Sequence, residues 1–324
     1  MKAIYYTKYG SPDVLELKEM DKPIPKDREV LVKVYAASIN SWDWDLLRGK
    51  PFIARLDGML KPKYKVLGAD IAGIVEAIGN NVTQFQIGDE VFGDISGCSW
   101  GGFAQYVCAD ENALAMKSPN MTFDEAAATS QAAVLALQGL RQGKLSKGQK
   151  VLINGAGGGV GTIAIQIAKS YGTEVTAVDQ ADKLDMLRSI GADHVIDYKT
   201  EPFTTYEQRY DLILDAWASR SIFEYKRILN PNGHYVMIGG ATSRIIQLIL
   251  LGHWISKSAN VTMGLLMHKP NKEDLNELNR LFEAGKVAPI IDRRYPLSET
   301  ADAFRYFGTG RTQGKIVITM GLDK

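Results

Sequence analysis

The chain has few of the features that would tie it to an oxidising compartment, a membrane or a nucleic acid. Only two cysteines, Cys98 and Cys108, occur among 324 residues. Two are too few for a disulfide framework, which favours a reducing, cytoplasmic setting. The formal net charge is +1, so we expect no general electrostatic attraction to nucleic acid or to an acidic membrane.

Long apolar runs are also missing, so no membrane span is expected. No run reaches the roughly 20 apolar residues that a helix needs to cross a bilayer. The nearest, residues 245–255, is shorter and contains Gln247 and His253. Its length indicates a buried helix, with a wall of a substrate pocket or a subunit contact as the alternatives.

Glycine, in contrast, is concentrated directly after an apolar strand-like run. Residues 151–161 read VLINGAGGGVG, and the helix-like stretch TIAIQIAKS follows. This is a variant of the G-x-G-x-x-G pattern, in which glycine allows positive φ and lets the backbone approach a pyrophosphate. A flexible loop that binds nothing is the alternative. The residues expected to cradle the pyrophosphate of a dinucleotide are Gly155, Gly158, Gly159, Val160 and Gly161.

Six short apolar runs alternate with helix-length segments in this part of the chain. They read VLIN, EVTAVD, HVIDY, DLILDA, HYVMIGG and NVTMGLL. This alternation predicts an α/β domain with a doubly wound, parallel, six-stranded Rossmann sheet. Asp179 ends the second run, where a carboxylate accepts hydrogen bonds from a ribose 2′-OH and repels a 2′-phosphate, which favours NADH.

The first third of the chain follows a different pattern. Short alternating runs such as EVLVKVYAAS and DIAGIVEAIG are separated by turn-rich pieces, which indicates a β-rich unit. Thr122 and Glu125 form a capping-box pattern at the start of a long helix. The closing run GKIVITM suits this β-rich unit better than a sheet that is already complete. We therefore expect a catalytic domain made of residues 1–122 and 270–324, with a dinucleotide-binding domain, residues 123–269, inserted between its two parts.

With these motifs the chain resembles the medium-chain dehydrogenase/reductase superfamily. It looks most like the zinc-independent quinone oxidoreductase branch, which includes zeta-crystallin-like and enone reductase proteins. The resemblance rests on SINSWDWDLLRG, VLGADIAGIVEAIG, GDEVFG, GGFAQYV, EAAATSQAAVLALQGL, NGAGGGVG, GADHVIDY and GKIVIT. It implies a GroES-like catalytic domain plus a Rossmann domain, an active site in the cleft between them, and a homodimer joined through the edges of the Rossmann sheets.

The alcohol dehydrogenases of the same superfamily bind zinc, and the resemblance shows which residues of this chain occupy the positions of their zinc ligands. Where they place a cysteine this chain has Asn40, and where they have Gly-His-Glu, residues 68–70 read Gly-Ala-Asp. Ala69 cannot bind a metal, and zinc needs about three protein ligands. Cys98 and Cys108 cannot form a four-ligand structural site. We therefore expect no zinc, and reduction of an activated double bond or a quinone rather than oxidation of a simple alcohol.

The expected reaction is transfer of hydride from NAD(P)H to the β-carbon of an enone or to a quinone. The developing enolate oxygen then needs hydrogen-bond donors. Asn40 is the first catalytic candidate, with a turn role as the alternative. Gln131 is the second, either facing the nicotinamide or buried in a structural role. Asp43 and Trp44 are assigned to the substrate pocket, Trp44 as a wall and Asp43 in a structural role. No His, Tyr or Lys stands out as a proton donor, and solvent can supply the proton.

The choice between NADH and NADPH stays open at this point. Lys183 and Tyr198 match positions that contact the 2′-phosphate in NADPH-using quinone reductases, which opposes the indication from Asp179. Lys183 as a solvated helix residue and Tyr198 as a packing residue are the alternatives. The residues expected to line the nicotinamide end, or else to belong to the core, are Ile238, Gly239, Leu265 and Leu266.

Two other functions remain as alternatives. A protein that binds the cofactor without turnover, as a sensor or interaction module, has the same fold, because function resides in the site. A zinc alcohol dehydrogenase is the third possibility, and bound zinc would support it.

Overall fold

The computed structural model describes residues 1–56, 58–98 and 100–321. Two compact units divide the chain. The first comprises Met1–Val134, Lys269–Gly285 and Pro289–Lys324, and the second comprises Leu135–His268 and Lys286–Ala288. The sequence predicted boundaries after residues 122 and 269. In the structure the first change between units falls inside one long helix, α2 (Phe123–Gln142).

The second unit contains the predicted sheet of six parallel strands. Along the chain these are β8 (Lys150–Asn154), β9 (Glu174–Asp179), β10 (His194–Asp197), β11 (Tyr210–Asp215), β12 (Leu229–Met237) and β13 (Thr262–Leu265). Across the sheet they run β10-β9-β8-β11-β12-β13. The order reverses between β8 and β11. In sheets of this kind, ligands bind beyond the carboxyl ends of the strands at such a point.

Four helices of this unit connect the strands. They are α3 (Gly159–Ser170), α4 (Leu184–Ser189), α5 (Ile222–Arg227) and α6 (Thr242–Ala259). The helix expected over residues 245–255 lies within α6, but its burial was predicted wrongly. Leu248 and Ile255 are buried, whereas Leu250 and Trp254 are exposed. A run that is apolar on all sides identifies a helix, but it does not reveal what covers each face.

The first unit is built on a seven-stranded sheet. Its main path runs β14-β15-β3-β4-β5-β7, and β6 pairs with β3. The strands are β3 (Glu29–Ser38), β4 (Asp70–Ile78), β5 (Glu90–Asp94), β6 (Tyr106–Asp110), β7 (Leu114–Met116), β14 (Ile291–Pro296) and β15 (Lys315–Thr319). A separate antiparallel pair consists of β1 (Lys2–Tyr5) and β2 (Glu16–Glu19). The closing run GKIVITM thus joins the β-rich unit, where β15 pairs with β3.

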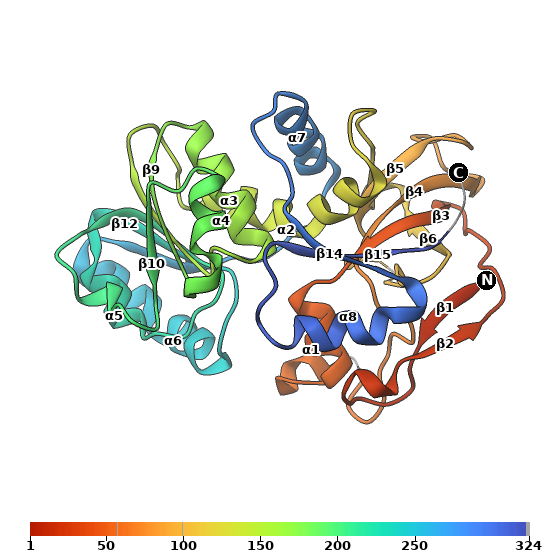
Figure 1. Ribbon diagram of the computed structural model, residues 1–324, viewed down its shortest axis with the longest axis horizontal. Coiled ribbons are helices and arrows are strands. Elements are labelled where there is room, and N and C mark those ends of the chain that lie inside the picture. Colours follow the sequence, from red (N-terminus) through yellow and green to blue (C-terminus); the bar gives the residue numbers. More distant parts are fainter. Residues whose placement is uncertain (57, 99, 322–324) are drawn as a thin grey trace. The chain divides into compact units, whose positions relative to one another are not determined.

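Helices α1 (Ser41–Arg48), α7 (Lys272–Glu283) and α8 (Thr300–Phe307) complete this unit (Figure 1). The predicted capping box is present at the start of α2. The backbone N–H of Thr122 donates to the Glu125 carboxylate at 2.8 Å, and the Glu125 N–H donates to the Thr122 hydroxyl at 3.2 Å. Short 3-10 turns are Pro12–Val14, Phe52–Arg55, Glu111–Ala113, Ala181–Lys183, Phe203–Thr205 and Leu297–Glu299.

Gly161 is the residue on which the packing of α3 against its preceding turn depends. A Cβ atom at Gly161 would lie 2.4 Å from Cα of Ala156 and 2.5 Å from its carbonyl oxygen. Both are backbone atoms of the turn after β8, so they cannot move aside as a side chain does. At Gly158, in contrast, the nearest atom to an added Cβ is 3.6 Å away.

We therefore expect Gly161→Ala to destabilise the chain by about 3 kcal/mol or more, because overpacking against fixed backbone is costly. Gly158→Ala, the matched control, should change stability by less than about 1 kcal/mol. Urea unfolding followed by circular dichroism measures both. Equal stabilities for the two variants would contradict this account of the turn.

Candidate functional site

The turn between β8 and α3 has the form expected of a phosphate cradle. Gly155 has a φ of 73°, which favours glycine. Gly158 is the N-cap of α3, and the first intrahelical bond runs from Thr162 N–H to Gly158 C=O. The N–H groups at the start of a helix have no intrahelical partner, and they favour anions. In this turn they belong to Gly159, Val160 and Gly161.

Asp179, at the end of β9, is bound to this turn. Its carboxylate accepts hydrogen bonds from Gly157 N–H at 2.7 Å and Gln180 N–H at 2.9 Å. The ammonium group of Lys183 lies 3.4 Å from the same carboxylate, and both side chains are buried. The charge of Asp179 is therefore compensated within the unit by Lys183. The hydrogen bond from Gly157 N–H ties this ion pair to the glycine turn.

A second buried carboxylate, Asp215, ends the neighbouring strand β11. It accepts hydrogen bonds from the Asn154 amide and the Tyr235 hydroxyl, each at 2.8 Å, and from Trp217 N–H at 3.3 Å. Asn154 directly precedes the first glycine of the turn. Burial raises the pKa of Asp215 to about 6, although these hydrogen bonds act in the opposite direction. The network fixes the carboxyl ends of β8 and β11 relative to one another.

The other predicted cofactor residues follow strands of the same sheet. Tyr198 comes directly after β10 and is exposed, and its N–H donates to the Asp179 carbonyl. Ile238 and Gly239 follow β12 and are half-buried. Leu265 ends β13, and Leu266 after it is buried. All of these positions therefore lie at or just past the carboxyl end of a strand.

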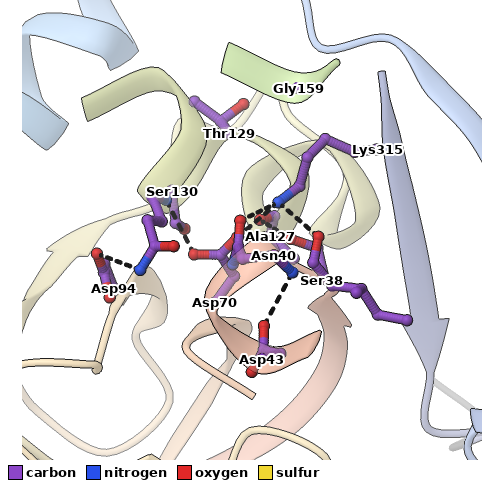
Figure 2. Close-up of polar contacts among 12 residues, drawn as sticks. Ser38, Asn40, Asp43, Asp70, Asp94, Ala127, Thr129, Ser130, Gly159 and Lys315 are labelled. Atoms are coloured by element: carbon purple, nitrogen blue, oxygen red, sulfur yellow. Dashed lines mark hydrogen bonds and ion pairs between the residues drawn. The ribbon is translucent and has the colours of Figure 1, made fainter. Parts of the chain in front are cut away.

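In the first unit, Asp70 is the centre of a buried polar cluster (Figure 2). One carboxylate oxygen accepts hydrogen bonds from the Ser38 hydroxyl at 2.6 Å and the Asn40 amide at 2.9 Å. The other oxygen accepts from Gln131 N–H at 2.9 Å. Asp70 is fully buried, and it faces Ser38 across the β3–β4 pair.

Lys315, the first residue of β15, supplies the positive charge of this cluster. Its ammonium group lies 3.1 Å from the Asp70 carboxylate and 2.5 Å from the Asn40 side-chain oxygen (Figure 2). It also donates to the Ile39 carbonyl at 3.1 Å. Three acceptors therefore take up the three N–H groups of the ammonium ion. Lys315 was not recognised in the sequence, where it is a single lysine at the start of an apolar strand.

Asn40 and Asp43 lie at the start of α1. The Asp43 carboxylate accepts from Asn40 N–H at 2.8 Å with one oxygen and from Gly68 N–H at 2.9 Å with the other. Asp43 is fully buried, and burial raises its pKa to about 7. The Asn40 side chain donates one amide N–H to Asp70, and an amide group has a second. Asp43 thus fixes the backbone that presents Asn40.

The remaining candidates of this unit are engaged in packing or in hydrogen bonds. Trp44 stacks on Phe304, with ring centroids 6.2 Å apart, and the Arg48 guanidinium lies 4.4 Å from its ring. Gln131 is buried, and its side-chain amide donates to Asp94 at 3.2 Å. Gln131 therefore connects α2 to both Asp70 and Asp94.

These residues do not fit a zinc ion. Over the described residues, no three His, Cys, Asp or Glu side chains gather closely enough to hold a metal ion. The Lys315 ammonium already lies against Asn40 and Asp70. A divalent cation bound to the same oxygens would be repelled by that ammonium.

The raised pKa of Asp215 has a consequence for stability. A carboxyl group whose pKa is higher in the folded chain than in the unfolded chain stabilises the fold below pH 4, and this contribution is lost as the pH rises. Between about pH 4 and pH 6 the wild-type chain should lose up to about 3 kcal/mol through this group.

Asp215→Asn removes the titration and should flatten this part of the stability curve. Unfolding in urea at several pH values from 4 to 8, for both proteins, measures the difference. The free energy of unfolding of wild type relative to the variant should fall as the pH rises. A constant difference would contradict the raised pKa.

Comparisons with known proteins agree with this geometry. Residues 26–120 match the alcohol dehydrogenase GroES-like domain, and residues 190–318 match the zinc-binding dehydrogenase family. The chain is 34% identical to a 2-methylene-furan-3-one reductase of Solanum lycopersicum, over 98% of this chain and 79% of that protein. It is 32% identical, with the same coverage, to an NADPH-dependent alkenal/one oxidoreductase of Arabidopsis thaliana.

A solved structure supports the same relationship. The quinone oxidoreductase of Coxiella burnetii is 30% identical and superposes with a TM-score of 0.89, covering 99% of both chains. No helix in the described ranges is long and apolar enough to cross a membrane. Both the GroES-like fold and the six-stranded parallel sheet are thus shared, as well as the sequence. The chain belongs to the quinone and enone oxidoreductase branch of the medium-chain dehydrogenase/reductase superfamily.

Proposed function

We propose that this chain catalyses NAD(P)H-dependent reduction of a quinone or an α,β-unsaturated carbonyl compound, without a metal ion. The observation that carries the proposal is the glycine turn after β8. Gly155 and Gly161 are required by the backbone itself, whereas a Cβ at Gly158 would make only an ordinary contact, 3.6 Å from the Gly155 carbonyl oxygen. The protein itself would tolerate a side chain at Gly158. A glycine at this position therefore suits the close approach of a ligand's phosphate to the backbone.

The nicotinamide, when bound, supplies the hydride. The chain must then stabilise the negative charge that develops on the substrate oxygen. Asn40 has a second amide N–H for this purpose, because the first is donated to Asp70. Lys315 acts through Asn40, since its ammonium binds the amide oxygen and polarises the group that carries the N–H. The proton that completes the reduction comes from solvent.

Loss of this donor should affect turnover more than binding. We expect Asn40→Ala to lower kcat about 100- to 1000-fold, as removal of one oxyanion donor does elsewhere, while cofactor affinity changes little. The fall in absorbance of the reduced nicotinamide, with a panel of quinones and enones, measures kcat and KM. The control is Gly158→Ala, which should weaken cofactor binding and leave saturated kcat unchanged.

The same panel separates the alternative function. If wild-type chain binds NADPH but turns over no quinone or enone, a cofactor-binding protein without turnover is supported and the proposed reductase is not. An unchanged kcat in Asn40→Ala would mean that the chain is a reductase but that Asn40 takes no part in the reaction.

We also propose NADPH as the preferred cofactor. Because Lys183 compensates the charge of Asp179, a 2′-phosphate near β9 meets no uncompensated carboxylate. Each oxygen of Asp179 also accepts a hydrogen bond from a backbone N–H, one from Gly157 and one from Gln180, so part of its acceptor capacity is used within the unit. Tyr198 is exposed at the end of the neighbouring strand.

Lys183→Met tests this preference. It leaves Asp179 without its cation, so NADPH should bind about 10-fold more weakly while NADH affinity changes much less. Calorimetric titration of the purified chain with each cofactor measures both dissociation constants. An equal loss for the two cofactors would mean that Lys183 only shapes the turn.

A cytoplasmic homodimer completes the proposal. β13 lies at one edge of the six-stranded sheet, where the strand of a second copy can pair. Light scattering in solution tests the dimer.

A further inference from the structure

The segment after α1 exposes an unusual amount of apolar surface for its length. Five large apolar side chains within nine residues are exposed: Phe52, Ile53, Leu56, Met59 and Leu60. Leu60 retains 92% of its accessible surface and Leu56 67%. Single exposed apolar residues are ordinary, but a group of this density marks an interaction site.

The same segment is strongly basic. Residues 50–65 contain four lysines, one arginine and one aspartate, so their formal charge is +4. The whole chain carries +1, which leaves −3 for all other residues. The net charge of the whole chain is close to zero, which opposes a general attraction to an acidic surface. Positive charge is nevertheless concentrated in residues 50–65.

Residues before and after position 57 in this segment are held by contacts with the rest of the unit. Ala54 and Pro62 are buried. The Arg55 guanidinium donates to the Gly49 carbonyl at 2.8 Å, and the Tyr9 hydroxyl donates to the Gly58 carbonyl at 2.5 Å. The described residues of the segment are therefore fixed by these contacts while their large apolar side chains stay exposed.

We propose that residues 50–65 dock this protein on the surface of an anionic lipid bilayer. Large apolar side chains interspersed with lysine and arginine are the combination that binds reversibly at an acidic membrane surface, where the apolar groups enter the headgroup region. Charge complementarity selects this occupant. Lysine is depleted from protein–protein interfaces, and a neutral quinone or enone gains nothing from five cations. The cytoplasmic face of a membrane carries the required negative charge.

Sedimentation of the full chain with lipid vesicles tests the proposal, and no cofactor is needed. Wild-type chain should bind vesicles of phosphatidylcholine mixed with phosphatidylserine, and bind pure phosphatidylcholine at least 10-fold more weakly. Added salt should weaken binding, because it screens the charges. Lys50→Glu with Lys61→Glu, and separately Phe52→Ser with Leu60→Ser, should each lower binding to the mixed vesicles at least 10-fold.

Matched variants elsewhere control for general effects. Ile24→Ser removes an apolar side chain that is 87% exposed, next to Lys22 and Lys26, which pair with Glu76 and Glu29. Lys147→Glu with Lys286→Glu reverses two exposed charges that lie outside the segment, in the second unit. Both controls should bind the mixed vesicles as wild type does.

Four results would overturn the proposal. The first is a wild-type chain that does not bind mixed vesicles. The second is equal binding to both lipids, and the third is equal loss of binding in the control variants. The fourth is unchanged vesicle binding in the segment variants, and a raised KM for the quinone in these variants would then assign the segment to the substrate pocket. Because vesicle binding is read without cofactor, failure here is distinct from failure of the reductase activity.

Discussion

The contact between Lys315 and Asp70 is the constraint around which the first unit is organised. A charge without a partner is very costly inside a protein, and a buried pair requires further hydrogen bonds to offset the loss of water. Asp70 obtains them from Ser38 on β3 and Gln131 on α2, while Lys315 obtains them from Ile39 and Asn40. Strands β3, β4 and β15 and helix α2 must therefore be in place together, and the position of Asn40 follows from their assembly.

The second unit handles its buried carboxylates in two ways. Asp179 has a cation, Lys183, and backbone N–H groups around it. Asp215 is surrounded by an amide, two tyrosine hydroxyls and a backbone N–H, none of them charged. Hydrogen bonds alone do not replace the lost hydration of Asp215, and its pKa is raised accordingly. The first arrangement supports the glycine turn after β8. The second holds two strand ends together, and it is the basis of the pH dependence expected of the free energy of unfolding.

Local patterns in the sequence were sufficient for the fold. The glycine turn, the six apolar runs and the capping box at Thr122 each depend on residues close together in the chain, and each appears in the structure. The site is different, because Asp70 and Lys315 are 245 residues apart and neither stands in a motif that names the other. Resemblance directed attention to Asn40, but only the pairing of β15 with β3 brings the lysine to it. The exposure of α6 was missed for a related reason, since composition alone does not reveal which apolar face is covered.

The saturation of Lys315 limits the chemistry that the cluster can perform. A zinc ion polarises a substrate oxygen directly and so allows oxidation of an alcohol that has no other activation. The Lys315 ammonium has its three N–H groups engaged by Ile39, Asn40 and Asp70, and donating to a substrate would leave one of these buried acceptors with less compensation. In the proposed reaction its influence passes through the amide N–H of Asn40, which polarises a substrate oxygen less strongly than a metal ion does. Such a site suits substrates that delocalise the incoming charge themselves, and conjugated carbonyl compounds and quinones have this property.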